Sequence, residues 1–181
     1  MNLLHFLGSL WNRISGRVPE NKADDEVQFR KMANRNRRMM RRALDASGLK
    51  YDFDKDNECF VVGFQSDDAG NVSFLLLIHS GINSYRAEAI GSRVEDLKLK
   101  DAILFCNKWN SENPFPRAYV APGTNHISGD MFLTLGLGAD NEYVQKFILR
   151  HFLTENCSFF NAAGQYDFIK SSAAPASASA E

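Results

Sequence analysis

The stretch FCNKWNSENPFPRAYV, residues 105–120, ends an apolar helix, turns through two prolines and begins a strand of alternating character. Pro114 and Pro116 stop either element from continuing through the turn, because proline lacks a backbone N–H and restricts the residue before it. A turn of this kind fixes the angle between helix and strand, so the segment sets how the two halves of the domain meet. No reacting group stands out in it. The stretch therefore predicts a fold more directly than a function.

Outward from this turn, the hydrophobic pattern predicts one α+β domain. Periods of 3.6 and 2 residues separate the helices from the strands, and the loops between successive strands are too short for parallel crossovers. We therefore expect one antiparallel sheet with the helices on one face. In chain order the predicted elements are a helix over 24–47, a four-strand meander at 51–53, 59–64, 72–79 and 84–90, a helix over 94–109, a two-strand hairpin at 117–121 and 127–135, and a helix over 140–156.

The same pattern predicts how far some elements are buried. The strand 72–79 is a continuous apolar run, which is typical of a central strand covered on both faces. Apolar side chains surround most of the helix 94–109, so we expect it to be largely buried. In the last helix, Tyr143 and Phe147 lie on the predicted apolar stripe, and Gly129 in the hairpin could mark a β-bulge.

Shifts in composition divide the chain into three parts. Residues 1–22 read as an amphipathic helix and a linker, residues 23–160 as the α+β domain, and residues 161–181 as an Ala/Ser-rich tail that we expect to be disordered. Charge is uneven along the chain: residues 1–50 hold eleven Lys and Arg against five Asp and Glu, and the remainder holds ten against seventeen. A basic front end on an acidic body indicates either self-docking or an anionic partner.

The N-terminal segment has one apolar side. Its candidate partner-binding residues are Leu3, Leu7, Leu10 and Trp11. A helix of this length would measure about 21 Å, which is too short to span a bilayer. Three places for it remain open: an apolar patch of its own domain or of a second copy, the membrane interface, or the groove of a partner protein.

The predicted helix 24–47 combines an apolar stripe, which runs from Phe29 to Ala43, with a dense basic surface. Seven cations fall within thirteen residues, without one acid among them: Arg30, Lys31, Arg35, Arg37, Arg38, Arg41 and Arg42. One interpretation is a solvated face whose arginines reach local carboxylates. The others are nucleic-acid phosphate, anionic lipid, an acidic protein partner, or the acidic body of the same chain. Nucleic acid is favoured less, because no aromatic residues alternate with the cations to stack on bases.

Catalytic groupings are not visible in the sequence. Cys59, Cys106 and Cys157 are far apart in apolar surroundings, which is typical of reduced, buried thiols in a cytosolic protein. The four histidines lack metal-ligand spacing, and there is no Ser/His/Asp order or nucleophile elbow. No run of residues has the length of a membrane span or the features of a secretory leader. We expect no catalytic residue, metal or cofactor, and a cytoplasmic location that allows membrane association.

The opening stretch resembles the "N-x-W-N … F-P-R-A-Y" segment of the YbjN-domain family. The matching residues are Asn107, Trp109, Asn110, Phe115, Pro116, Arg117 and Tyr119, and the resemblance extends to Leu44-x-x-x-Gly48-Leu49-x-Tyr51 and covers about residues 25–157. The resemblance implies a fold similar to that of type III secretion chaperones, which are often dimeric and bind extended segments of other proteins. It implies a regulatory role in sensory transduction and carries over no catalytic residue. The signature itself favours a structural device over a ligand site.

Together these observations predict a non-enzymatic bacterial regulatory or chaperone-like module that binds a protein partner, as a homodimer. The alternative is a peripheral membrane or nucleic-acid binder that acts through the basic helix from Arg30 to Arg42.

Overall fold

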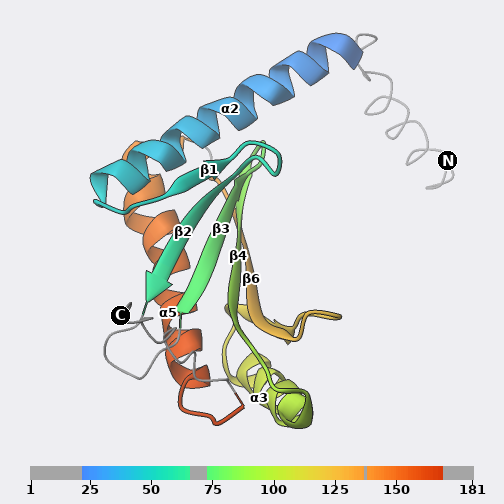
Figure 1. Cartoon of the computed structure of the whole chain (residues 1–181). Helices are drawn as coiled ribbons and strands as arrows, with labels where there is room; N and C mark the ends of the chain where they lie inside the picture. Colours follow the sequence, from blue (N-terminus) through green and yellow to red (C-terminus); the bar gives the residue numbers. More distant parts are fainter. Residues whose placement is uncertain (1–21, 66–72, 137, 169–181) are drawn as a thin grey trace, which may run out of the picture.

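The computed structural model describes residues 22–65, 73–136 and 138–168, and these form a single antiparallel sheet with helices packed against it (Figure 1). The strands are β1 Asp52–Asp54, β2 Cys59–Gln65, β3 Ser73–Ser80, β4 Ser84–Arg93, β5 Arg117–Val120 and β6 His126–Thr134. Their order in the sheet is β1-β2-β3-β4-β6-β5. The predicted α+β class is confirmed, as are the four-strand meander and the added hairpin. The hairpin attaches through β6, so that β5 becomes an edge.

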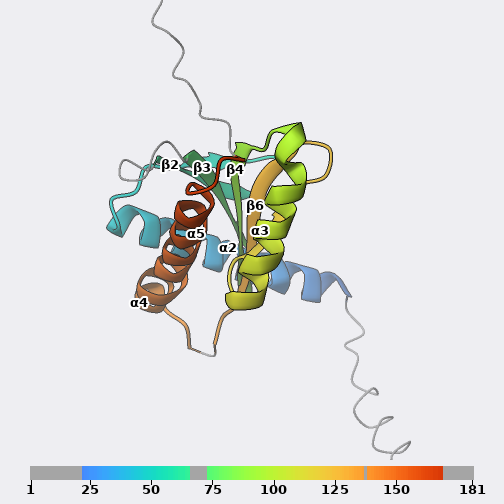
Figure 2. The ribbon, with the colours of Figure 1, turned by 90° about the horizontal axis from the view of Figure 1, so that it is seen from below.

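The helices lie around one face, one edge and one end of this sheet. They are α2 Lys22–Ala46, the short 3₁₀ turn η1 Asp96–Lys98, α3 Leu99–Glu112, α4 Asn141–Tyr143, the π-helical turn η2 Val144–Leu149 and α5 Arg150–Ala163. α5 lies against the sheet, where the ring of Phe160 stacks on that of Phe74 with centroids 4.5 Å apart. Figure 2 shows α3 and α5 from the end of the sheet. The two helices meet through the rings of Phe105 and Phe159, whose centroids are 5.9 Å apart. α2 crosses the end of the sheet and packs on η2, α4 and β3.

The two faces of the sheet differ in burial. On β3, Phe74, Leu76 and Ile78 are buried against the helices, whereas the alternate residue Leu75 is 48% exposed. The prediction that strand 72–79 is covered on both faces is therefore wrong. Within the described residues the helices stand on one side only, and the apolar run of β3 alternates between a covered and an uncovered face.

α3 is less buried than its composition predicts. Its buried side chains are Ala102, Phe105 and Cys106, and Leu104 is more than half exposed. The difference arises because α3 lies along the β5 edge and not inside the core, so only the flank toward α5 and the sheet is covered. The last helix, in contrast, extends further than predicted.

α5 runs to Ala163, beyond the predicted end near residue 156, and Phe168 after it is buried. The packed structure therefore continues past residue 160. The physical reason is that Phe159 and Phe160 continue the apolar stripe of Phe152, so that further turns of helix are held against the sheet.

Gly129 does not mark a bulge in β6. The irregular register lies in β4, between Ile90 and Arg93. Gly129 is required for a different reason: a Cβ there would lie 2.9 Å from Cγ of Pro116. The turn at 114–116 thus packs directly on the β6 backbone.

Candidate functional site

The family-like signature ties α3 to the edge of the sheet. The indole N–H of Trp109 donates to the Pro116 carbonyl at 3.1 Å. The Asn110 side chain acts as a strand would: its Nδ2 donates to the Ala118 carbonyl at 2.9 Å, and its Oδ1 accepts from the Ala118 N–H at 2.8 Å. Both edge groups of Ala118 are thereby satisfied, and α3 closes the outer side of β5. The Phe115–Pro116 bond within this turn is cis.

The other signature residues lie apart from these hydrogen bonds of Trp109 and Asn110, which we call the clasp. Arg117 and Asn107 are exposed, and Phe115 places its ring 5.6 Å from the ring of His151. Tyr119 lies on the uncovered face of the sheet, where its hydroxyl donates to Glu88 at 3.2 Å. The structure therefore distributes the signature over a turn, an edge and a face, and does not gather it into one pocket.

Tyr119 belongs to a polar network in the middle of the uncovered face. Arg86 Nε donates to Asp130 at 2.9 Å, and its Nη2 lies 3.5 Å from Glu88. Burial, together with the neighbouring Glu88 carboxylate, raises the pKa of Tyr119 to about 12. The two acids, the arginine and the Tyr119 hydroxyl satisfy one another across β4, β5 and β6, so this network needs no further ligand.

Removing the Asn110 clasp is expected to destabilise the fold. Asn110→Ala leaves both edge groups of Ala118 without their protein partner, so we expect the free energy of unfolding to fall by roughly 1 to 3 kcal/mol. Urea unfolding followed by circular dichroism measures this change. Asn107→Ala is the matched control, because its exposed side chain sits three residues away on the same helix; an equal loss in both variants would contradict the role given to Asn110.

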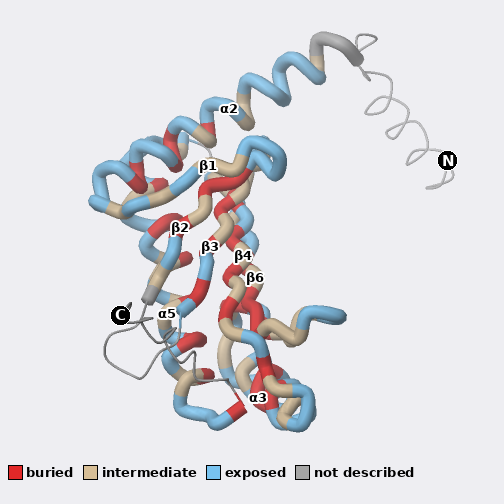
Figure 3. Tube along the Cα trace, in the orientation of Figure 1, coloured by how far each residue is buried: buried red, intermediate tan, exposed pale blue. Residues whose placement is uncertain are grey.

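The basic helix α2 has an anchored half and a projecting half. Asn36, Met39, Met40, Ala43 and Leu44 are buried in the anchored half, whereas none of residues 25–35 is buried (Figure 3). Figure 1 shows this first half extending past the sheet. The predicted apolar stripe is thus only partly covered: Phe29, at its start, is 49% exposed.

The seven cations of α2 are only partly matched by acids of the same chain. Arg30 pairs with Glu26 and Arg37 with Glu58, each at 2.9 Å. The Arg37 guanidinium also lies 5.3 Å from the centre of the Phe53 ring.

The remaining cations have no carboxylate partner in the described part of the chain. Arg41 lies 6.0 Å from the rings of Phe53 and Phe60, and Arg35 donates to the Ala139 carbonyl at 3.3 Å. Lys31, Arg38 and Arg42 are exposed and make no ion pair or side-chain hydrogen bond with the described residues. Among the described residues, the basic surface along the outer side of the helix is therefore only partly compensated. The other predicted partner-binding residues, Leu3, Leu7, Leu10 and Trp11, lie outside the described residues.

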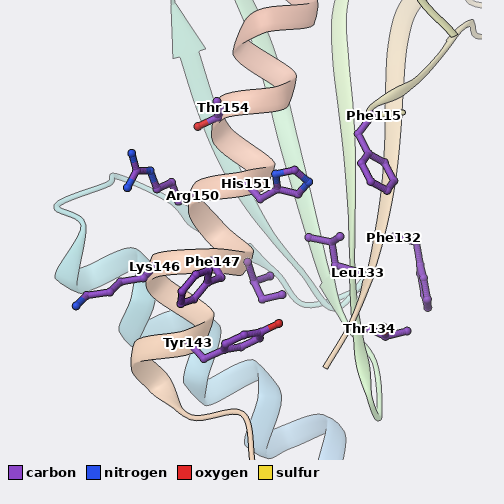
Figure 4. Close-up of a pocket in the computed structure, with 11 residues that line it drawn as sticks. Phe115, Phe132, Leu133, Thr134, Tyr143, Lys146, Phe147, Arg150, His151 and Thr154 are labelled. Carbon is purple, nitrogen blue, oxygen red and sulfur yellow. The ribbon is translucent and has the colours of Figure 1, made fainter. Parts of the chain in front are cut away.

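A cleft of about 750 Å³ lies between the C-terminal end of β6 and the helical segment α4-η2-α5 (Figure 4). Its lining is mainly aromatic and apolar, with basic groups and no carboxylate: Phe115, Phe132, Leu133, Thr134, Tyr143, Lys146, Phe147, Ile148, Arg150, His151 and Thr154. Figure 4 shows Tyr143 and His151 directed toward β6, and Lys146 and Arg150 on the outer side of the helix.

The sequence interpretation missed this cleft. It assigned Tyr143 and Phe147 to a buried stripe, but Phe147 is 61% exposed, and the two rings stack on each other 5.3 Å apart. The π-helical turn at 144–149 shifts the stripe relative to a regular helix, and such turns are frequent at functional sites. The sequence did contain one signal. Because side chains alternate along a strand, Phe132 is a large aromatic residue on the face opposite Met131 and Leu133.

The thiols and ligating groups do not form a reactive centre in the described residues. Cys59 and Cys106 are buried, and burial raises the pKa of all three thiols, that of Cys106 to about 11. Burial therefore disfavours the nucleophilic thiolate. No cluster of three or more His, Cys, Asp or Glu side chains that could hold a metal occurs within residues 22–65, 73–136 and 138–168. No helix in these ranges is long and apolar enough to cross a bilayer.

The buried Cys106 makes stability depend on alkaline pH. Its folded-state pKa of about 11 exceeds the ordinary value of 9.0, so the folded state holds its proton more tightly than the unfolded state does. The thiol's contribution to the free energy of unfolding, roughly 2 to 3 kcal/mol, is complete below pH 9. It is lost as the pH rises through about 11. Urea unfolding between pH 8 and about 11 should show this loss. In Cys106→Ala the slope should be shallower, and an unchanged slope would contradict the assignment.

Comparison with known proteins places the chain in a family. Residues 36–165 match the model of the YbjN family, described as "Putative bacterial sensory transduction regulator", and the chain belongs to that family. Among solved structures it is similar to "Crystal structure of YbjN, a putative transcription regulator from E. coli", with a TM-score of 0.53 and 11% sequence identity over 70% of this chain and 89% of that chain. At this identity the likeness establishes the fold. The search of curated proteins found no match.

Proposed function

We propose that this protein is a non-enzymatic regulatory module that binds another protein in a chaperone-like manner, and that it acts as a homodimer in the bacterial cytoplasm. The observation that carries the proposal is the projecting half of α2. A family of sensory transduction regulators supports the regulatory role, and the raised thiol pKa values argue against cysteine catalysis.

The projecting half of α2 supports protein binding because little in the described part of the chain stabilises it. Short isolated helices are marginal in water, and most helical stability comes from packing of an apolar face. Val27 and Phe29 are about half exposed, and covering either of them fully would be worth roughly 1 to 2 kcal/mol. A second copy or a protein partner laid along this face would supply the missing packing. The cations Lys31, Arg38 and Arg42 of α2, which have no ion-pair partner among the described residues, would select an acidic surface.

The experiment that tests the proposal reverses charge on α2 in the full chain. Arg38→Glu with Arg42→Glu changes two exposed cations, and the matched control is Lys100→Glu with Lys108→Glu on exposed positions of α3. We expect crosslinked capture of the protein partner to fall by at least about tenfold in the α2 variant and to persist in the control. Sedimentation should show a dimer that Phe29→Asp dissociates. Strictly monomeric protein without a captured partner would contradict the proposal.

A second candidate function, binding to an anionic surface, is favoured by the cations Lys31, Arg38 and Arg42, which lack a described partner. Binding to vesicles with anionic lipid and to nucleic acid, each at two salt concentrations, separates it from the first. Salt-sensitive binding that is lost in the α2 charge reversal would support the second candidate, and salt-sensitive lipid binding lost on deleting residues 1–17 would locate the membrane contact in the N-terminal segment. Absence of binding to both would remove it.

A further inference from the structure

The sheet leaves part of one edge open beside the cleft. β5 pairs with β6 from Ile127 to Asp130, and Asn110 of α3 closes the outer side of β5. β6 continues as Met131–Thr134, with β4 on one side and no strand among the described residues on the other. β5 and α3 therefore cover only the first part of this edge of β6.

The hydrogen bonds show which backbone groups point outward from this stretch. The N–H of Leu135 donates across to the β3–β4 turn at 2.7 Å, and the C=O of His126 accepts from the residue after β5 at 2.8 Å. Residues of an antiparallel ladder alternate between their two neighbours. The N–H and C=O of Phe132 and Thr134 therefore point toward the open edge, where they can pair with an added strand.

The cleft supplies side-chain pockets next to this backbone. Leu133, between the two outward-pointing residues, faces the helices, and Phe115 and Ile148 line the cleft beside it. On the other face of β6, Phe132 is 58% exposed. A strand laid along the edge would place alternate side chains into the cleft and against Phe132.

The charge of the cleft favours an acidic occupant. Lys146 and His151 each have an acid nearby, at 2.6 and 3.6 Å, whereas Arg150 is exposed and has no ion-pair partner in the described part of the chain. The lining itself contains no carboxylate. The uncompensated positive charge therefore sits at the outer rim.

We propose that an extended segment of a partner polypeptide adds to the sheet along Phe132 and Thr134, with apolar side chains at alternate positions in the cleft and an acidic side chain near Arg150. The inference rests on the proposed protein-binding function and adds a second site and the chemistry of its occupant. A small amphipathic anion fits the cleft less well, because it would leave the outward N–H and C=O groups of β6 without partners.

The test is fluorescence anisotropy of the full-length protein with labelled peptides. A library of about eight-residue peptides carries Val, Leu or Phe at alternate positions and Asp, Ser or Lys between them, a length that spans the open edge. We expect the best binder to contain an acid. We expect N-methylation of its alternate amides to weaken binding about tenfold in one of the two registers and to leave the other register unchanged. If N-methylation weakened binding in neither register, strand addition would be overturned. Displacement of the bound peptide by octanoate would also overturn it.

Variants at exposed positions separate this inference from the proposed function. Phe147→Ala and Arg150→Glu should each lower the affinity for the selected peptide about tenfold. The matched controls on α2, Phe29→Ala and Arg42→Glu, should leave peptide binding unchanged. If no library peptide binds, or if the α2 variants alone weaken it, the cleft proposal fails while partner capture through α2 still stands. If capture fails and the peptide still binds, only the α2 proposal fails.

Discussion

Replacing Phe160 by alanine is expected to lower the free energy of unfolding by about 3 to 5 kcal/mol, one of the two largest effects we predict. The Phe160 side chain is fully buried where α5 crosses the sheet, stacked on Phe74 and in edge contact with Phe159 at 4.8 Å. Truncation removes these contacts and leaves a cavity that the rigid sheet cannot close. Urea unfolding measures the loss, and Phe147→Ala is the control because its ring is mostly exposed.

Gly91 gives this prediction a second, opposite test. A Cβ on Gly91 would fall within 3.0 Å of Cδ1 of Phe160, nearer still to Cε1, and 3.2 Å from Cγ2 of Ile127. Gly91→Ala alone should therefore cost about 1 to 3 kcal/mol. In a Phe160→Ala background the same substitution should cost much less, because the added methyl group enters the cavity. Additive free energies in the double variant would contradict the packing described for this crossing.

The meander and its antiparallel pairing were predictable because their signals are local. The residues that form β2, β3 and β4 alternate or run apolar between short turns, and the strand pairing follows from those turns. What pattern alone could not decide is which face receives a helix. Leu75 and Leu76 are adjacent and equally apolar in the sequence, yet one is half exposed and the other fully buried, because α5 arrives from one side only.

The candidate surfaces show a similar division. The cations of α2 were visible as a run in the sequence, but Phe29 and Met39 belong to the same apolar stripe and only the position of the body shows that one projects and the other is buried. The cleft depends on a π-helical turn and on the mismatch in length between β5 and β6. The length mismatch follows the hairpin predicted at 117–121 and 127–135, but the π-helical turn is a product of tertiary packing and not of periodicity, so the sequence pattern alone did not predict the cleft.

Asn36 is the residue that sets where α2 leaves the body, and its replacement by aspartate is the second large expected effect. Its Nδ2 donates to the carbonyls of Gly81 at 2.9 Å and Ile82 at 2.7 Å, and its backbone carbonyl accepts from the Tyr85 hydroxyl at 2.8 Å. Asn36→Asp keeps the shape but cannot donate when ionised, so a buried carboxylate would face two carbonyl oxygens. We expect a loss of about 3 to 5 kcal/mol at neutral pH.

The loss should depend on pH with a definite sign. Burial next to carbonyl oxygens disfavours the charged form, so the pKa of the new carboxyl in the folded state lies above its unfolded value of about 3.9. The variant should therefore be most stable below about pH 4 and should weaken as the pH rises through its folded pKa. Urea unfolding at several pH values reads this out, with Asn34→Asp, exposed on the same helix, as the matched control. A variant as stable as the parent at pH 8 would show that Arg35 pairs with the carboxylate, and that α2 is held by its apolar contacts without the two hydrogen bonds from Asn36.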